Sequence, residues 1–133
     1  MVLVDANVLL DVLTDDADWR EWSEAQLLRE VETEVLAINP IIYAELTPAY
    51  RAVAELERAL KGWPLQRLPL PYEAGFLAGH AFVRYRQEGG RRRSPLPDFY
   101  IGAHAQHARL SLLTRDATRY RTYFPHVDVI APE

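Results

Sequence analysis

The first ten residues of the chain combine a short apolar run with acidic and amide side chains. Val2-Leu3-Val4 is a continuous apolar run of the kind found in parallel strands that are covered on both faces. Asp5, Ala6 and Asn7 follow it, and a second apolar run begins at Val8. This order predicts a buried strand that passes directly into a helix, with Asp5 at the edge where open α/β sheets hold their ligands. Asp5 or Asn7 could equally serve only as the cap of that helix.

Apolar runs alternate with amphipathic stretches along the rest of the chain. The pattern predicts strands at residues 35–38, 111–113 and 127–130, and a weak strand or extended connection at 65–70 that Pro69 interrupts. It predicts helices at 19–32, from 40 through Glu45, at 47–61, 72–88 and 97–109, and from 114 onward. Asn39 before Pro40 is a typical helix start, and Gly75, Gly79 and Ala81 suggest close packing of their helix against a neighbour. Strands that alternate with helices indicate a three-layer α/β/α domain with a mostly parallel central sheet. With 133 residues, we expect one domain spanning residues 1–133.

The composition excludes several classes of protein. The chain has no cysteine, which excludes disulfides, zinc–thiolate sites and thiol chemistry. No apolar run approaches the roughly 20 residues of a membrane-spanning helix. We therefore expect a soluble, cytoplasmic protein.

The charge is distributed unevenly along the chain. Residues 1–45 hold eleven acidic and two basic side chains, whereas residues 46–133 hold eight acidic and thirteen basic ones. Fourteen of the fifteen basic residues are arginine, whose planar guanidinium group suits phosphate. A basic C-terminal part suggests a polyanionic partner, although a compositional bias toward arginine explains most of these residues equally well.

Four acidic residues are expected at the same edge of the sheet. Asp5 and Asp116 follow strands, Asp98 begins a helix, and Glu45 lies in the second turn of another helix. In a parallel α/β sheet, strand carboxyl ends and helix N-termini share one edge. Each acid alone has a structural explanation as a cap, a first-turn carboxylate or an exposed residue.

As a cluster, these acids need either a cation or a shared proton to coexist. Two carboxylates about 4 Å apart repel each other by roughly 4 kcal/mol at a typical protein dielectric. Oxygen ligands without cysteine favour Mg²⁺ or Mn²⁺. Such a site can activate water and stabilise both oxygens of an in-line phosphodiester displacement.

With these residues in place, the chain resembles a PIN domain, most closely a VapC-type toxin of a VapBC toxin–antitoxin pair. The similarity extends over nearly the whole chain. The C-terminal ending at residues 124–132 is also similar. The resemblance rests mainly on four segments, which occur in this order: Val4-Asp5-Ala6-Asn7-Val8-Leu9-Leu10, Tyr43-Ala44-Glu45-Leu46, Pro97-Asp98-Phe99-Tyr100-Ile101-Gly102-Ala103-His104-Ala105 and Leu112-Leu113-Thr114-Arg115-Asp116.

The resemblance implies a Mg²⁺- or Mn²⁺-dependent endoribonuclease whose acidic pocket both binds the metal and catalyses the reaction. Asp5, Glu45, Asp98 and Asp116 lie at the positions of that pocket, and Asn7 and Thr114 match residues that support it. The resemblance also implies a homodimer and a VapB-type antitoxin that blocks the pocket.

The chain departs from the family pattern in two ways, and neither removes an acid. Ala6 replaces a residue that often carries a hydroxyl, and Pro40 and Pro48 are unusual around Glu45. The helix with Trp19 and Trp22 and the region of Tyr43 offer apolar surface for a protein partner. The sequence does not show which of them would contact the antitoxin and which the second copy of the chain.

Arginines near the acids are candidates for contacts to RNA phosphates, namely Arg91, Arg92, Arg93 and Arg115. The alternative is that the triple-arginine loop is only solvated. His104 and His107 point away from the face of Asp98 on their helix, so we interpret them as surface or packing residues.

Other functions fit the residues less well. Lys61 is followed by Gly62-Trp63 and so cannot form a P-loop. A phosphoacceptor domain would need a lysine near the last strand, and a glycosidase would leave two acids unexplained. A housekeeping PIN-domain RNA-processing nuclease, and a catalytically silent PIN-like module that binds RNA or protein, remain the alternatives.

Overall fold

The strands of the computed structural model, which describes all 133 residues, form one five-stranded sheet. The strand order is β3-β2-β1-β4-β5, and every neighbouring pair is parallel. The prediction of an α/β domain with a mostly parallel sheet is therefore confirmed, and the sheet is parallel throughout. The strands are β1 (Val2–Val4), β2 (Leu36–Ile38), β3 (Leu65–Arg67), β4 (Ser111–Leu113) and β5 (Val129–Ile130).

The central strands are buried as their apolar sequences predict. All residues of β1 and β2 are buried, whereas the edge strands β3 and β5 are partly exposed. A single cluster of 25 buried apolar residues forms the core around this sheet. Burial on both faces explains why the central strands contain apolar runs instead of an alternating pattern.

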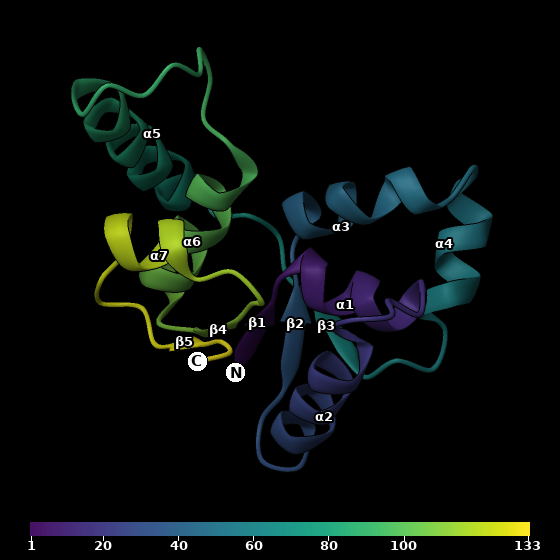
Figure 1. Ribbon diagram of the computed structural model, residues 1–133. Helices are drawn as coiled ribbons and strands as arrows, with labels where there is room; N and C mark the ends of the chain where they lie inside the picture. Colours follow the sequence, from purple (N-terminus) through teal and green to yellow (C-terminus); the bar gives the residue numbers. More distant parts are fainter.

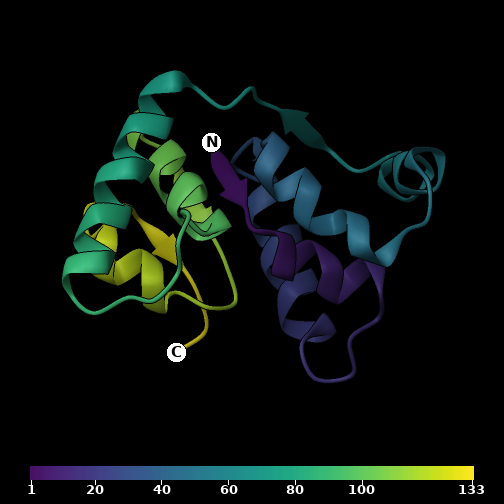
Figure 2. The same ribbon diagram turned by 90° about the horizontal axis from the view of Figure 1, so that it is seen from above.

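The helices form two groups on opposite sides of the sheet. Figure 1 shows α5, α6 and α7 on one side of the strands and α1 to α4 on the other, and the view from above in Figure 2 keeps this separation. Their bounds are α1 (Ala6–Leu13), α2 (Arg20–Val31), α3 (Pro40–Leu46), α4 (Val53–Leu60), α5 (Tyr72–Gln87), α6 (Pro97–Ala108) and α7 (Thr118–Tyr123), with a 3₁₀ turn η1 (Thr47–Ala49) after α3.

The strand register aligns the carboxyl ends of β1 and β4. Val4 is paired with Leu113, so Asp5 and Thr114 emerge side by side. The backbone N–H of Asp5 donates to the carbonyl of Leu113 at 2.8 Å, which extends the pairing by one residue. The sheet therefore brings together residues that are more than a hundred positions apart in the sequence.

The helix expected at 47–61 is broken. The preceding helix, α3, ends here, because the hydroxyl of Thr47 donates to the carbonyl of Ala44 at 2.7 Å and Pro48 has no N–H to continue α3. A single 3₁₀ turn follows, and Tyr50 has an extended backbone before α4 begins.

The close-packing role expected for Gly75 and Gly79 is wrong. A Cβ atom at either glycine would meet nothing within 4 Å. Ala81, the third residue of that prediction, is buried together with Ala74 and Ala78. The close approach between α6 and α7 instead depends on Gly102, because a Cβ there would overlap the ring of Phe124.

None of the helices is both long enough and apolar enough to cross a lipid bilayer.

Candidate active site

Asp5 links the end of β1 to the start of α1, and its side chain is buried, with 5% of the residue exposed. Its Oδ1 accepts the N–H of Ala6 at 2.8 Å, and its Oδ2 accepts the hydroxyls of Thr114 at 2.8 Å and Tyr120 at 2.9 Å. Burial is the largest effect on this carboxyl and raises its pKa to about 6, against the lowering by its hydrogen bonds. Asp5 therefore both caps α1 and faces the neighbouring strand end.

Asp98 lies in the first turn of α6, next to Asp5. The hydroxyl of Tyr120 is 3.4 Å from its Oδ1, and Nη1 of Arg119 is 3.5 Å from its Oδ2. Burial raises the pKa of Asp98, and the guanidinium of Arg119 opposes this increase. The next residue, Phe99, is fully buried and fixes this turn of α6 against Tyr85, at 5.5 Å between ring centres.

Glu45 approaches from α3. Burial is the main cause that raises the pKa of its carboxyl to about 7, and the charges of Asp5 and Asp98 add to the effect. Its Oε1 is buried without any hydrogen-bond partner. A buried carboxylate oxygen without a partner is costly, which marks Glu45 as a group that lacks a ligand.

The position of α3 is fixed by a buried contact to α6. Nδ2 of Asn39 donates to Nδ1 of His104 at 3.0 Å, while Oδ1 of Asn39 accepts the N–H of Ile42. Burial lowers the pKa of His104 and favours the neutral ring that this bond requires. His104 thus has the packing role proposed for it, and His107 lies on the surface, 3.2 Å from Glu73.

Asp116 is exposed at the rim of this group. Its Oδ1 accepts the N–H of Thr118 at 3.1 Å, and its charge contributes to the raised pKa of Asp98. Its backbone N–H and carbonyl both lie 3.2 Å from Oγ1 of Thr114. The loop after β4 therefore holds Asp116 against the residue that contacts Asp5.

Asn7 and Thr114 connect these elements. Nδ2 of Asn7 donates to Oγ1 of Thr114 at 3.3 Å, and Oδ1 of Asn7 accepts the N–H of Arg115 at 3.1 Å. Thr114 is fully buried and has one hydroxyl proton, which the 2.8 Å contact assigns to Asp5. Both residues thus hold the loop after β4 next to the start of α1.

The deciding comparison is with protein families. The model of the PIN domain family matches residues 2–125, which is nearly the whole chain. The chain belongs to the PIN domain family. None of the curated protein sequences matches it significantly.

Solved structures with the same fold include chains of toxin–antitoxin complexes. This PIN domain aligns with a chain of VapBC2 from Rickettsia felis, bound to a DNA fragment from its promoter, with a TM-score of 0.76, 16% identity and 100% of both chains covered. For FitAcB from Neisseria gonorrhoeae the TM-score is 0.71 at 21% identity, covering 98% of this chain and 96% of the other. A toxin–antitoxin complex from Klebsiella pneumoniae gives 0.66 at 25% identity, covering 100% and 98%.

The donor chemistry of this PIN domain fits a hard divalent cation. Carboxylates from β1, α3 and α6 have raised pKa values, and one buried oxygen of Glu45 lacks a partner. A cation would remove both the repulsion and the missing contact. No three acidic or histidine side chains are close enough together in this structure to hold an ion. The hydroxyl of Tyr120 lies within hydrogen-bonding distance of both Asp5 and Asp98.

The candidate arginines differ in their surroundings. Arg91, Arg92 and Arg93 are exposed and form no ion pair. In contrast, Nε and Nη2 of Arg115 donate to the two oxygens of Asp11 at 3.0 and 2.8 Å. Two of the five N–H donors of the Arg115 guanidinium are thus used inside the PIN domain.

Tyr120, Arg119 and Asp11 were missed by the sequence analysis. Asp11 interrupts the apolar sequence of α1 and is 2% exposed, which is a signal that a charged residue there needs a partner. Tyr120 gives no such signal, because a tyrosine on a short helix usually indicates packing.

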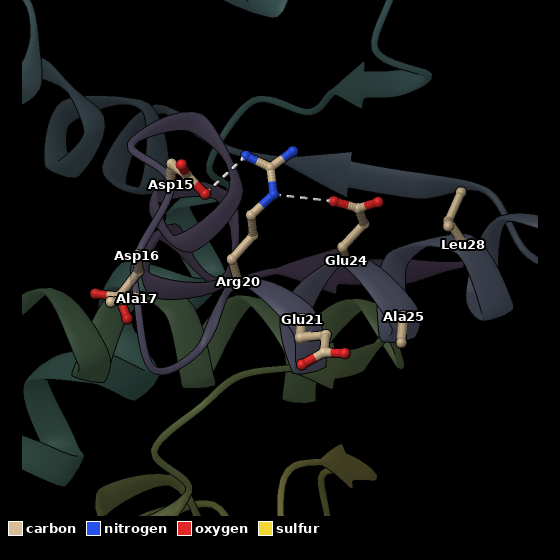
Figure 3. A pocket seen from close by; sticks show the side chains of 8 residues that line it. All are labelled: Asp15, Asp16, Ala17, Arg20, Glu21, Glu24, Ala25 and Leu28. Carbon is tan, nitrogen blue, oxygen red and sulfur yellow. Dashed lines mark hydrogen bonds and ion pairs between the residues drawn. The ribbon is translucent and has the colours of Figure 1, made fainter.

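A separate cavity of about 550 Å³ lies between the α1–α2 turn and α2. Figure 3 shows Arg20 between Asp15 and Glu24, at 3.3 and 3.2 Å, within its largely acidic lining. None of the four predicted acids lines this cavity.

Proposed function

We propose that this PIN domain is a Mg²⁺- or Mn²⁺-dependent endoribonuclease and the toxin of a type II toxin–antitoxin pair. The observation that carries the proposal is the convergence of Asp5, Glu45 and Asp98 from three separate elements, with raised pKa values and one unpartnered buried oxygen. A structural role would not require carboxylates to be placed where they repel one another.

Four acids are proposed to hold the metal: Asp5, Glu45, Asp98 and Asp116. A bound Mg²⁺ or Mn²⁺ ion would supply Lewis acidity, which lets water attack a phosphodiester at neutral pH and neutralises the charge that develops on its oxygens. Three hydrogen bonds orient the carboxylate of Asp5. Asp116 is exposed, and its Oδ2 makes no hydrogen bond, so it is the acid best placed to accept a proton from the attacking water.

The RNA is proposed to approach over the α5–α7 group. Residues 69–133 contain nine arginines against six acidic residues, whereas residues 1–68 contain six basic against thirteen acidic residues. Arg91, Arg92 and Arg93 are exposed in the loop before α6 and can contact phosphates without breaking an ion pair. Arg115 can contact a phosphate only through the guanidinium N–H groups that do not bind Asp11, and the side chain of Arg115 is 32% exposed.

An antitoxin and a second copy of the chain are the proposed protein partners. The support for an antitoxin is that the chains with similar structures come from toxin–antitoxin complexes. Exposed apolar side chains on α2 and α5 provide surface for such contacts, and they include Leu28, Val31, Tyr72, Phe76 and Val83. Trp19 and Tyr43 are less free, because they contact Arg115 and Glu57 respectively.

The experiment is RNA cleavage by the purified, antitoxin-free chain in Mg²⁺, Mn²⁺ or EDTA. Asp98→Asn should abolish cleavage, whereas Asp18→Asn, which removes the same charge from an exposed turn, should cleave like the wild type. Cleavage that persists in EDTA or in Asp98→Asn would contradict the proposal. A folded wild type that cleaves no RNA would favour the silent binding module.

A further inference from the structure

Tyr120 is the residue that connects two of the proposed metal ligands. It lies in the middle of α7, and only 1% of the residue is exposed. Its hydroxyl is 2.9 Å from Oδ2 of Asp5 and 3.4 Å from Oδ1 of Asp98. These carboxylates come from different elements, the β1–α1 junction and α6, and no other side chain forms hydrogen bonds with both.

Only these two acids satisfy the hydroxyl. A buried phenol needs a hydrogen-bond partner, and a phenylalanine could fill the same apolar space without that need. The hydroxyl has one proton, which it donates to Asp5 at 2.9 Å or, by rotating about its C–O bond, to Asp98 at 3.4 Å. It thus lies within donating distance of both carboxylates.

Asp98 has few other restraints. Its remaining contact is Nη1 of Arg119 at 3.5 Å, at the limit for a hydrogen bond, and its side chain is 34% exposed. Asp5 in contrast also accepts from Ala6 and Thr114 at 2.8 Å. The hydroxyl of Tyr120 therefore connects a well-anchored carboxylate to a weakly anchored one.

We propose that Tyr120 is a positioning residue that sets the separation and orientation of Asp5 and Asp98 for the metal ion. This inference rests on the proposed function, because it concerns the same acidic pocket. Groups that orient metal ligands by hydrogen bonds typically change metal affinity by about 10–100-fold when removed. Tyr120 does not contact the substrate in this proposal; it acts through the two carboxylates.

The test is the affinity for Mn²⁺ alone, measured by calorimetry on the full chain. Tyr120→Phe keeps the ring and removes only the hydroxyl. Tyr123→Phe is the matched control, because it removes a hydroxyl from the same helix that bonds Glu88 instead. We expect Tyr120→Phe to weaken Mn²⁺ binding by about tenfold or more and to lower kcat for RNA while leaving KM nearly unchanged. Tyr123→Phe should match the wild type.

A double-mutant cycle separates positioning from packing. In an Asp98→Asn background, Tyr120→Phe should weaken Mn²⁺ binding less than threefold, because the connection to Asp98 is already altered. All affinities are measured at a temperature well below the melting temperature of the least stable variant, so that each protein is folded.

Each outcome bears on a different claim. Equal Mn²⁺ affinity of Tyr120→Phe and the wild type, or an equally large loss in both backgrounds, would overturn the positioning role alone. A wild type that binds no Mn²⁺ would overturn the proposed function and this inference with it.

Discussion

The carboxylate of Asp11 holds the guanidinium of Arg115 through two hydrogen bonds, at 2.8 and 3.0 Å, across 104 residues of sequence. The hydroxyl of Ser23 donates to the same carboxylate at 2.7 Å, and the guanidinium lies 5.3 Å from the ring centre of Trp19. This cluster ties α1 and α2 to the loop that carries Asp116. An acidic residue outside the pocket thus helps to hold the pocket together.

Removing the two partners should have unequal effects on the free energy of unfolding. Arg115→Ala leaves the buried Asp11 carboxylate with Ser23 alone and should cost about 3 kcal/mol. Asp11→Asn leaves Arg115, whose side chain is 32% exposed, able to reach water, and should cost about 1–2 kcal/mol. Urea unfolding measures both values, and equal costs would show that the pair does not carry an uncompensated buried charge.

Thr114→Val tests the hydroxyl that contacts Asp5. Valine has nearly the same shape, so the substitution removes the 2.8 Å hydrogen bond and leaves Asn7 without an acceptor. We expect a loss of about 1–2 kcal/mol in stability and about tenfold weaker Mn²⁺ binding. Thr122→Val, on the exposed side of α7, is the control. Unchanged Mn²⁺ affinity in Thr114→Val would exclude a supporting role.

The raised pKa values predict how the stability of the metal-free protein depends on pH. Glu45 titrates at about 7 in the folded chain and near 4.5 when unfolded, so the folded state retains the proton longer. Its penalty is absent below pH 4, grows as the pH rises, and is complete above about pH 7. The melting temperature of metal-free wild type relative to Glu45→Gln should therefore fall between pH 5 and pH 8.

Adding Mn²⁺ at pH 8 should raise the melting temperature of the wild type and so reverse this fall relative to Glu45→Gln, because the ion replaces the lost proton. A constant difference in melting temperature between the two metal-free proteins from pH 5 to pH 8 would contradict the environment described for Glu45.

The triple-arginine loop can be tested through salt dependence. Replacement of Arg91, Arg92 and Arg93 by alanine should weaken RNA binding by inactive Asp98→Asn protein. It should also reduce the slope of log affinity against log salt by about 2, since each contact to a single strand contributes roughly 0.7. The control replaces Arg51, Arg58 and Lys61, which removes the same charge from the α4 region. Identical slopes for both variants would mean that the loop is only solvated.

Local patterns predicted much of this fold correctly. The run Val2-Leu3-Val4 and the pair Asn39-Pro40 each specify a structure through contacts between near neighbours, and the structure has the expected strand and capped helix. The prediction of a continuous helix at 47–61 was wrong, because Tyr50 and Ala52 have extended backbones between the 3₁₀ turn and α4, and no local pattern in the sequence predicts this break.

Contacts between residues far apart in the sequence limited how much of the candidate site could be predicted. The edge position of Asp5 follows from strand order, so its neighbours in a parallel sheet could be anticipated. The hydroxyl of Tyr120 reaches Asp5 over 115 residues, and the Asp11–Arg115 pair depends on how α1 packs against the loop after β4. No periodicity in the sequence encodes such contacts.

The most direct test of the acidic pocket is a calorimetric titration of the metal-free chain with Mn²⁺ at pH 7.5. The account predicts saturable binding by the wild type, binding at least about tenfold weaker in Glu45→Gln, and unchanged binding in Asp18→Asn. Wild-type protein that binds no Mn²⁺, or Glu45→Gln protein that binds it as tightly as the wild type, would contradict the assignment of these carboxylates to one metal site.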